Sequence, residues 1–466
     1  MMVTRASLGP NLAAALLFFC VAGCSGKTVA PNDAPAGASG SNGEGHAPGT
    51  ALPPDIVEPG GSGPAYPGTG FVVHEWGTNT VVLGSDGSMQ RGLHHEEEDL
   101  PAFVYDRKSE LARAPTNVKM ETPVTYFYSD KPLTATATVM FPKGIFTQWY
   151  PQVASYAPFM IAGKGDPALD RDFPYSTPAC REEYSRVHDG FLSWGNVEVL
   201  ARDVSPSAPE AALDRFTWSH ARAVAANPVR ITVDGKSQDE RFLFYRGLGN
   251  FPLDVKITSA DDGTLTLANL DPKNRAGAAF VLRVEKDKAA FAVHAGGIAP
   301  SANLNATAPP ATQAIDAYVQ DLAKAMVTEL DKAGLYHDES IAMVKTWARQ
   351  WFRTPGVRVL YLAPQAWTDA QIPLTITPEP VSKVRVMVIR VEALTRAQEK
   401  DDVAAASLFA SEGTMGQAVA HFDSLGRFGE PRLRRALALV DGPAPAGALA
   451  YLDKISGADV AMRAGE

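Results

Sequence analysis

The chain has 466 residues, with 43 Lys and Arg against 52 Asp and Glu, and its formal net charge is -9 at pH 7. This mildly acidic balance, without a dense Lys/Arg stripe, argues against a nucleic-acid partner, because phosphate backbones attract basic surfaces. The hydrophobic content of 45% and the charged content of 20% are typical of a globular protein. They exclude disorder throughout the chain and a polytopic membrane protein.

Residues 1–23 are typical of a secretory signal. Arg5 supplies a positive charge, and residues 12–21 form an uncharged apolar run that is too short to span a bilayer. The sequence Val-Ala-Gly-Cys ending at Cys24 resembles the lipobox of bacterial lipoproteins, which implies lipidation of Cys24 and cleavage before it. By analogy with Gram-negative sorting, Ser25 at the next position favours the outer membrane. We therefore predict a lipid-anchored protein facing the periplasm or the cell surface, with an ordinary cleaved signal as the alternative.

Residues 24–69 comprise the lipidated cysteine and a predicted flexible tether. Ten glycines and eight prolines occur among residues 25–69, interspersed with small polar residues. A flexible chain of this length has an end-to-end distance of about 35–40 Å. That length is enough to hold a folded body clear of lipid headgroups.

Residues 70–300 predict a β-rich domain. Short apolar or alternating runs recur between turn signals, for example at residues 71–73, 80–83, 124–128 and 134–141. Ten or so strands at this spacing favour antiparallel sheets arranged as a β-sandwich.

Residues 311–394 predict a smaller α+β module, because the hydrophobic period changes after residue 310. Helices are expected over residues 315–330 and from about residue 338, and strands over residues 357–362, 372–376 and 384–391. Arg390 and Glu392 fall on one face of the last strand and predict an ion pair.

Residues 395–466 predict a helical tail. Thr395 and Gln398 have the spacing of a capping box, and Pro431 suits a first helical position. The predicted fold class is therefore α+β.

One constellation of residues suggests metal chemistry. His74, His94 and His95 fall within 22 residues, beside four consecutive acids at residues 96–99. Imidazole and carboxylate together suit a divalent ion such as zinc, so these three histidines are candidate ligands. His74 and Glu75 would point to opposite faces of a strand and would not share an ion without a bulge. The alternative is an acidic turn whose histidines pair with neighbouring carboxylates.

Four motifs carry a family resemblance: His-Glu-Trp-Gly-Thr at 74–78, Gly-Leu-His-His-Glu-Glu-Glu at 92–98, Lys-Met-Glu-Thr-Pro-Val at 119–124 and Arg-Val-Met-Val at 385–388. Together they resemble a family of exported proteins of myxobacteria and planctomycetes, over residues 70 to about 394. The resemblance implies relatedness and export, and it implies no activity, cofactor or catalytic residue.

Two hypotheses for function follow. The first is a lipid-anchored binding or scaffold protein, attached to the membrane through Cys24, whose partner is an envelope protein or polysaccharide. The second is a metal-dependent hydrolase with the three histidines as ligands and Glu97 or Glu121 as ligand or general base. The first is favoured because the sequence contains no serine-hydrolase, phosphate-loop or dinucleotide motif. Whether the protein is an enzyme stays open at this point.

Overall fold

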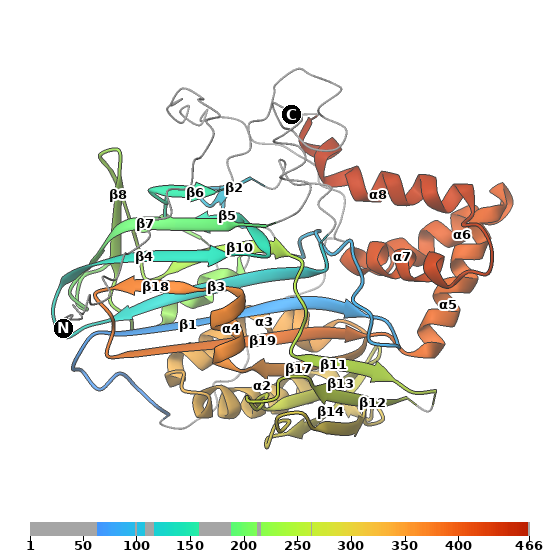
Figure 1. Ribbon diagram of the computed structural model, residues 1–466, viewed down its shortest axis with the longest axis horizontal. Helices are drawn as coiled ribbons and strands as arrows, with labels where there is room; N and C mark the ends of the chain where they lie inside the picture. Colours follow the sequence, from blue (N-terminus) through green and yellow to red (C-terminus); the bar gives the residue numbers. More distant parts are fainter. Residues whose placement is uncertain are drawn as a thin grey trace, which may run out of the picture. The chain divides into compact units, whose positions relative to one another are not determined.

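The computed structural model describes residues 63–97, 100–107, 116–157, 188–211, 216–261 and 263–464 (Figure 1). Within these residues the fold is α+β, as predicted: extended sheets dominate the amino-terminal part, and helices end the chain. No helix within these ranges is both long and apolar enough to cross a membrane.

The main sheet has ten strands within the described part of the chain, and its centre is formed by β1 and β19. In spatial order the strands are β16 (Gln313–Ala314), β14 (Lys288–His294), β13 (Ala279–Val284), β17 (Gly356–Ala363), β19 (Ser382–Ala393), β1 (Val72–Leu83), β3 (Val118–Tyr128), β10 (Leu243–Gly249), β5 (Gly144–Tyr150) and β2 (Tyr105–Asp106). Neighbours are antiparallel except β1 and β19, which run parallel from Val72 opposite Ser382 to Leu83 opposite Ala393. Every residue of β1 is buried, as expected for a central strand covered on both faces.

Three of the four sequence motifs named above lie side by side at the centre of this sheet. Residues 74–78 belong to β1, residues 119–124 to β3 and residues 385–388 to β19. The pairing of β1 with β3 shifts between Trp76 and Thr78, and a Cβ on Gly77 would lie 2.9 Å from the Cα of Pro123. The glycine of the first motif therefore makes room for the proline of the third.

Two smaller sheets accompany the main one. One, with six strands among the described residues, contains β18 (Leu374–Thr377), β4 (Leu133–Phe141), β7 (Gly190–Val199), β8 (Val229–Val233) and β9 (Lys236–Glu240), with β6 (Ser155–Ala157) paired to β7. The other has three strands, β11 (Val255–Ser259), β12 (Thr264–Asn269) and β15 (Asn303–Thr307).

The two faces of the main sheet bury different partners. Val73 and Val81 of β1 share a core with the two smaller sheets, an arrangement compatible with the predicted β-sandwich. Val72 and Trp76 of the same strand point the other way. Their core is completed by α2 (Ile315–Lys332), α3 (His337–Arg353) and the 3-10 helix η2 (Thr217–Ala223).

The carboxy-terminal helices form a core of their own, shown in orange to red in Figure 1. They are α5 (Arg396–Ser407), α6 (Glu412–Asp423), α7 (Gly429–Leu439) and α8 (Ala446–Ala464), with the 3-10 helices η3 (Leu408–Ala410) and η4 (Gly426–Phe428); the short α4 (Gln365–Gln371) lies earlier, before β18. The capping box predicted at Thr395 and Gln398 is confirmed. A second, small cluster of Val82, Leu93, Leu394 and Phe428 connects these helices to the body.

The structure differs from the sequence-based domain division in two places. The predicted boundary near residue 310 does not divide the sheet, because β17 and β19 from the second region pair with β13 and β1 from the first. The last residues of the predicted tether also contact the body. Pro64 accepts a hydrogen bond from the His337 N–H, and the Tyr66 ring stacks on Tyr128 at 5.4 Å.

Candidate metal centre

His94 and His95 lie in the segment between β1 and β2. Leu93 anchors this segment in the small cluster with Val82 and Phe428, and the Gly92 N–H donates to the Thr116 carbonyl. An apolar anchor next to two imidazoles fixes where the rings can point.

The two histidines meet one carboxylate from the far end of the chain. Glu430, in the first turn of α7, places its Oε2 atom 3.3 Å from His95 Nε2 and 3.7 Å from His94 Nε2. One ligand atom from each of the three residues lies within 4.8 Å of the others. His94 and Glu430 are buried, and the His95 side chain is 20% exposed. Two imidazoles and a carboxylate thus converge on one small volume.

The Oε1 atom of Glu430 accepts hydrogen bonds from Arg434 and Ser456, which are not among the three converging residues. Arg434 donates to Oε1 from Nε and from a terminal nitrogen, at 2.9 and 2.7 Å, and the Ser456 hydroxyl donates at 3.0 Å. Burial raises the pKa of Glu430, but the neighbouring histidines and Arg434 outweigh it and leave that pKa below its usual range. The carboxylate is therefore ionised at neutral pH and oriented with one oxygen toward the rings.

Cationic side chains hold the backbone and acids of the same segment. Lys119 of β3 donates to the carbonyls of His94 and His95 at 2.9 and 2.7 Å, and it contacts Glu96 at 3.0 Å. Glu96 also contacts Arg246 at 3.0 Å.

Glu97 is bound by two arginines. Arg390 and Arg427 lie 3.0 and 2.8 Å from its Oε2 atom. Arg390 also contacts Glu392 at 2.8 Å, which confirms the ion pair predicted on β19. Glu97 was predicted as a ligand or general base, but both of its described charge partners are permanent cations.

Glu121 occupies the middle of β3 and is fully buried. Its two oxygens accept from Arg427 at 2.7 and 3.3 Å, and the Thr80 hydroxyl donates to Oε2 at 2.7 Å. Burial alone would raise the pKa of Glu121, but Arg427 and Lys119 lower it to about 2. A carboxylate with such a pKa is a poor proton acceptor, which argues against its predicted role as general base.

His74 lies apart from this group. Its Nδ1 atom is 2.8 Å from Glu339 of α3, whose other oxygen accepts from the Tyr128 hydroxyl at 2.8 Å. Glu75 points to the opposite face, where it pairs with Arg385 at 2.6 Å, so the two residues do diverge as expected. The structure therefore does not bring His74 to His94 and His95.

Sequence reasoning missed Glu430. It is 335 residues from His95, and its local pattern, an acid in the first turn of a helix, has an ordinary explanation in the helix dipole. Nothing in the sequence alone connects it to the two histidines. Of the other predicted residues, Cys24, Glu98 and Asp99 lie outside the described residues.

No protein-family model matches this chain, and no curated protein matches it. Among solved structures, the yeast delta-COP-I mu-homology domain aligns over 70% of this chain and 98% of that domain, with 8% sequence identity and a TM-score of 0.25. A likeness at this TM-score carries no argument about fold or function.

Proposed function

We propose that this chain is a lipid-anchored protein of the cell envelope with a binding or scaffold role, stabilised by a divalent metal ion. The metal ligands are His94, His95 and Glu430. The observation that carries the proposal is that Glu430 Oε2 faces both imidazoles, at 3.3 and 3.7 Å. The ion would stabilise the contact between the carboxy-terminal helices and the β-rich body, because its ligands come from both.

The spacing of these atoms suits a metal. In a tetrahedral zinc site with bonds of about 2.0–2.2 Å, neighbouring ligand atoms are about 3.3–3.6 Å apart. The two contacts to Glu430 are at or near that separation. Arg434 and Ser456 orient the carboxylate from behind, as outer partners do in zinc sites. Zinc is the metal we expect, because two imidazoles and one carboxylate suit it.

The surroundings support a stabilising ion better than a hydrolytic one. Glu97 and Glu121, the candidate general bases, are each bound by arginine. The ligands come from two parts of the chain, a segment of the body and helix α7, so a shared ion would connect those parts. The hydrolase alternative retains one supporting feature, since three protein ligands would leave a coordination position for water.

The envelope part of the proposal rests on the sequence. The lipobox ending at Cys24 and the Gly/Pro-rich segment after it support attachment to the outer membrane through lipid. An anchored body on a tether suits capture of an envelope protein or polysaccharide. Replacement of Cys24 by Ala should abolish incorporation of labelled palmitate and release the protein from the membrane fraction. Unchanged palmitate labelling would reject the anchor.

Metal content tests the centre directly. The full chain, extracted in neutral detergent without a His-tag, should contain about one zinc per chain by plasma mass spectrometry. His95→Ala and Glu430→Gln should each lose most of it. His188→Ala is the matched control, because this histidine pairs with the adjacent Asp189 and belongs to a different part of the fold. Wild-type protein that remains metal-free after incubation with zinc would overturn the proposal.

A further inference from the structure

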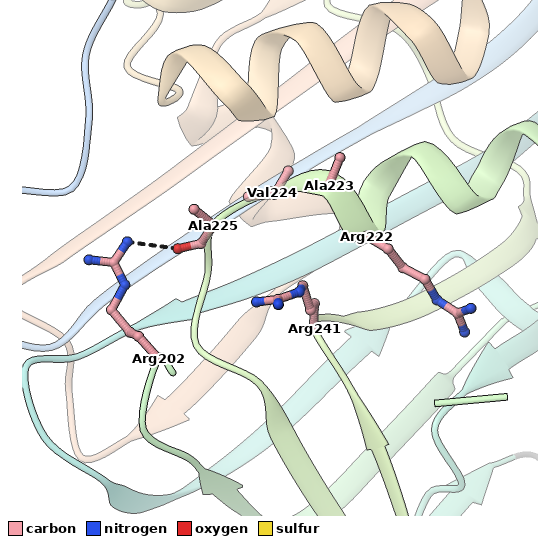
Figure 2. A pocket seen from close by; sticks show the side chains of 6 residues that line it. All are labelled: Arg202, Arg222, Ala223, Val224, Ala225 and Arg241. Carbon is pink, nitrogen blue, oxygen red and sulfur yellow. Dashed lines mark hydrogen bonds between the residues drawn. The ribbon is translucent and has the colours of Figure 1, made fainter. Parts of the chain in front are cut away.

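A hollow lined by three arginines lies away from the metal centre. It encloses about 290 Å³ between Arg202, Arg222, Arg241 and residues 223–225 (Figure 2). Arg202 follows β7, Arg222 belongs to η2, and Arg241 connects β9 to β10. Among the residues that the structure describes, no Asp or Glu side chain belongs to this lining.

The three arginines differ in whether a carboxylate neutralises their charge. Arg222 makes a bidentate pair with Glu240, with contacts of 3.0 and 2.7 Å to one oxygen and 3.2 Å to the other. Arg202 donates to the Ala225 carbonyl at 2.8 Å, and Arg241 donates to the Ala226 carbonyl at 3.0 Å. A guanidinium has five N–H donors, so these single contacts to neutral carbonyls leave donors for a ligand.

Neighbouring groups fix both of these side chains in place. The Arg202 guanidinium lies 5.2 Å from the centre of the Tyr66 ring, in addition to its bond to Ala225. In Figure 2 the Arg241 side chain extends toward Arg202, whereas Arg222 extends away from both. Two guanidinium groups held by backbone contacts lose little freedom when a ligand binds.

The local charge is positive in an acidic chain. Within the described ranges, two carboxylates make hydrogen bonds with the lining: Glu240 pairs with Arg222, and Asp338 accepts from the Ala225 N–H at 2.8 Å. Three arginines against two acids leave a local charge of +1, although the whole chain carries -9. This contrast favours an anionic ligand at this site.

We propose that this arginine pocket binds a phosphate group, presented by a free phosphorylated molecule or by a phospholipid headgroup. Donors from two guanidinium groups suit a tetrahedral, doubly charged anion better than a planar carboxylate. The volume is near the lower limit of small-molecule sites, about 300–1,000 Å³. Arg202 and Arg241 bind the phosphate, and Arg222, which is paired with Glu240, lines one side of the pocket. The site is independent of the proposed metal centre.

Titration with inorganic phosphate tests the pocket. With the full chain in neutral detergent at constant ionic strength, calorimetry should detect saturable binding that Arg202→Gln and Arg241→Gln each weaken about tenfold or more. Arg275→Gln is the matched control, because Arg275 is exposed and also donates to a backbone carbonyl, that of Gly296 at 2.8 Å. Unfolding temperatures measured without phosphate show whether each variant folds. If Arg241→Gln does not fold, Arg241→Lys replaces it, because lysine keeps the charge but loses the guanidinium donors.

The outcomes separate clearly. Phosphate binding that is absent in the wild type, or is equally weakened in Arg275→Gln, overturns the proposal. If binding is lost only in the pocket variants, the source is identified by repeating the titration in vesicles. If phosphatidylcholine vesicles that contain phosphatidic acid weaken phosphate binding, and vesicles of phosphatidylcholine alone do not, the ligand is a lipid headgroup. Unchanged phosphate affinity in both vesicles assigns a free phosphorylated molecule.

Discussion

Arg427, just before α7, donates to both carboxylate oxygens of Glu121 in the middle of β3, across 306 residues of chain. Both side chains are buried. Removal of either one would therefore leave the other as a buried charge without a partner, which is strongly destabilising. With the His94, His95 and Glu430 group, this pair connects the carboxy-terminal helices to the sheet. In the described part of the chain, this junction therefore combines buried polar pairs with the small apolar cluster around Phe428.

Loss of one partner of this pair should destabilise the whole body. Glu121→Gln should lower the free energy of unfolding by about 3 kcal/mol, the usual cost of leaving a buried charge without its partner. In a double-mutant cycle with Arg427→Met, the double variant should lose less than the sum of the two single losses. Urea unfolding measures all three variants. Additive losses would show that the two residues are not coupled.

Acid should act through the same carboxylate. Arginine and lysine neighbours hold the pKa of Glu121 near 2, below the value of 4.5 in an unfolded chain. Its contribution is therefore present above about pH 4.5 and is lost as pH falls toward 2, by up to about 3 kcal/mol. Unfolding free energies measured from pH 7 to pH 3 should fall less steeply in Glu121→Gln than in the wild type.

Asp254 should have the opposite pH dependence. Burial raises its pKa to about 6, although the Tyr361 hydroxyl donates to one oxygen at 2.7 Å. Its second oxygen has no hydrogen-bond partner within the described ranges. Stability from this group is present below about pH 4 and is lost as pH rises through 6. Asp254→Asn should raise the unfolding temperature at pH 8 and leave it nearly unchanged at pH 4. Equal changes at both values would exclude this explanation.

Gly92 tests how tightly the candidate metal centre is built. Its φ is 99°, and a Cβ there would lie 2.6 Å from Glu430 Oε1. Gly92→Ala should therefore displace Glu430 and weaken zinc binding, in addition to the backbone cost of about 1 kcal/mol. Gly235→Ala is the control, because its φ is 74° and nothing lies within 4 Å of its added Cβ. Equal zinc affinity in the two variants would contradict a role for Glu430.

Chelation should separate a stabilising ion from a catalytic one. At a free metal concentration of 100 times the dissociation constant, a bound ion adds about 2.7 kcal/mol to stability. Chelator should lower the unfolding temperature of the wild type and leave His95→Ala unchanged, because that variant has no ion to lose. Limited proteolysis should then cleave first near residue 394, where the helices join the body. An unaltered unfolding temperature after zinc removal would favour the hydrolase alternative.

The sequence predicted the elements of this fold better than their partners. Hydrophobic period predicted α2, α3 and β19 to within a few residues, since these patterns are local. The parallel pairing of β1 with β19 has no local signal, because burial of both strands in the sheet does not specify which strand lies beside which. The change of period near residue 310 marks helices that cover the sheet, and the sequence pattern alone does not distinguish such helices from the start of a separate module.

The residues of the candidate site also differ in whether the sequence alone could identify them. His94 and His95 were identified from residue type and proximity in sequence, which is local information. Glu430 was not, because only the tertiary fold brings α7 to that segment. His74 shares the motif of residues 74–78 but points toward α3, where Glu339 satisfies it.

The parallel pairing of β1 with β19 also constrains when the protein can fold. Residues 72 and 382 are opposite each other in the centre of the main sheet, so the first long strand has no partner on that edge until the chain is almost complete. At about 5–20 residues per second, synthesis of the intervening 310 residues takes on the order of 15–60 s. During that time one edge of β1 has no strand partner, which is a hazard for aggregation. The order of strands along the chain therefore places the completion of the main sheet late in synthesis.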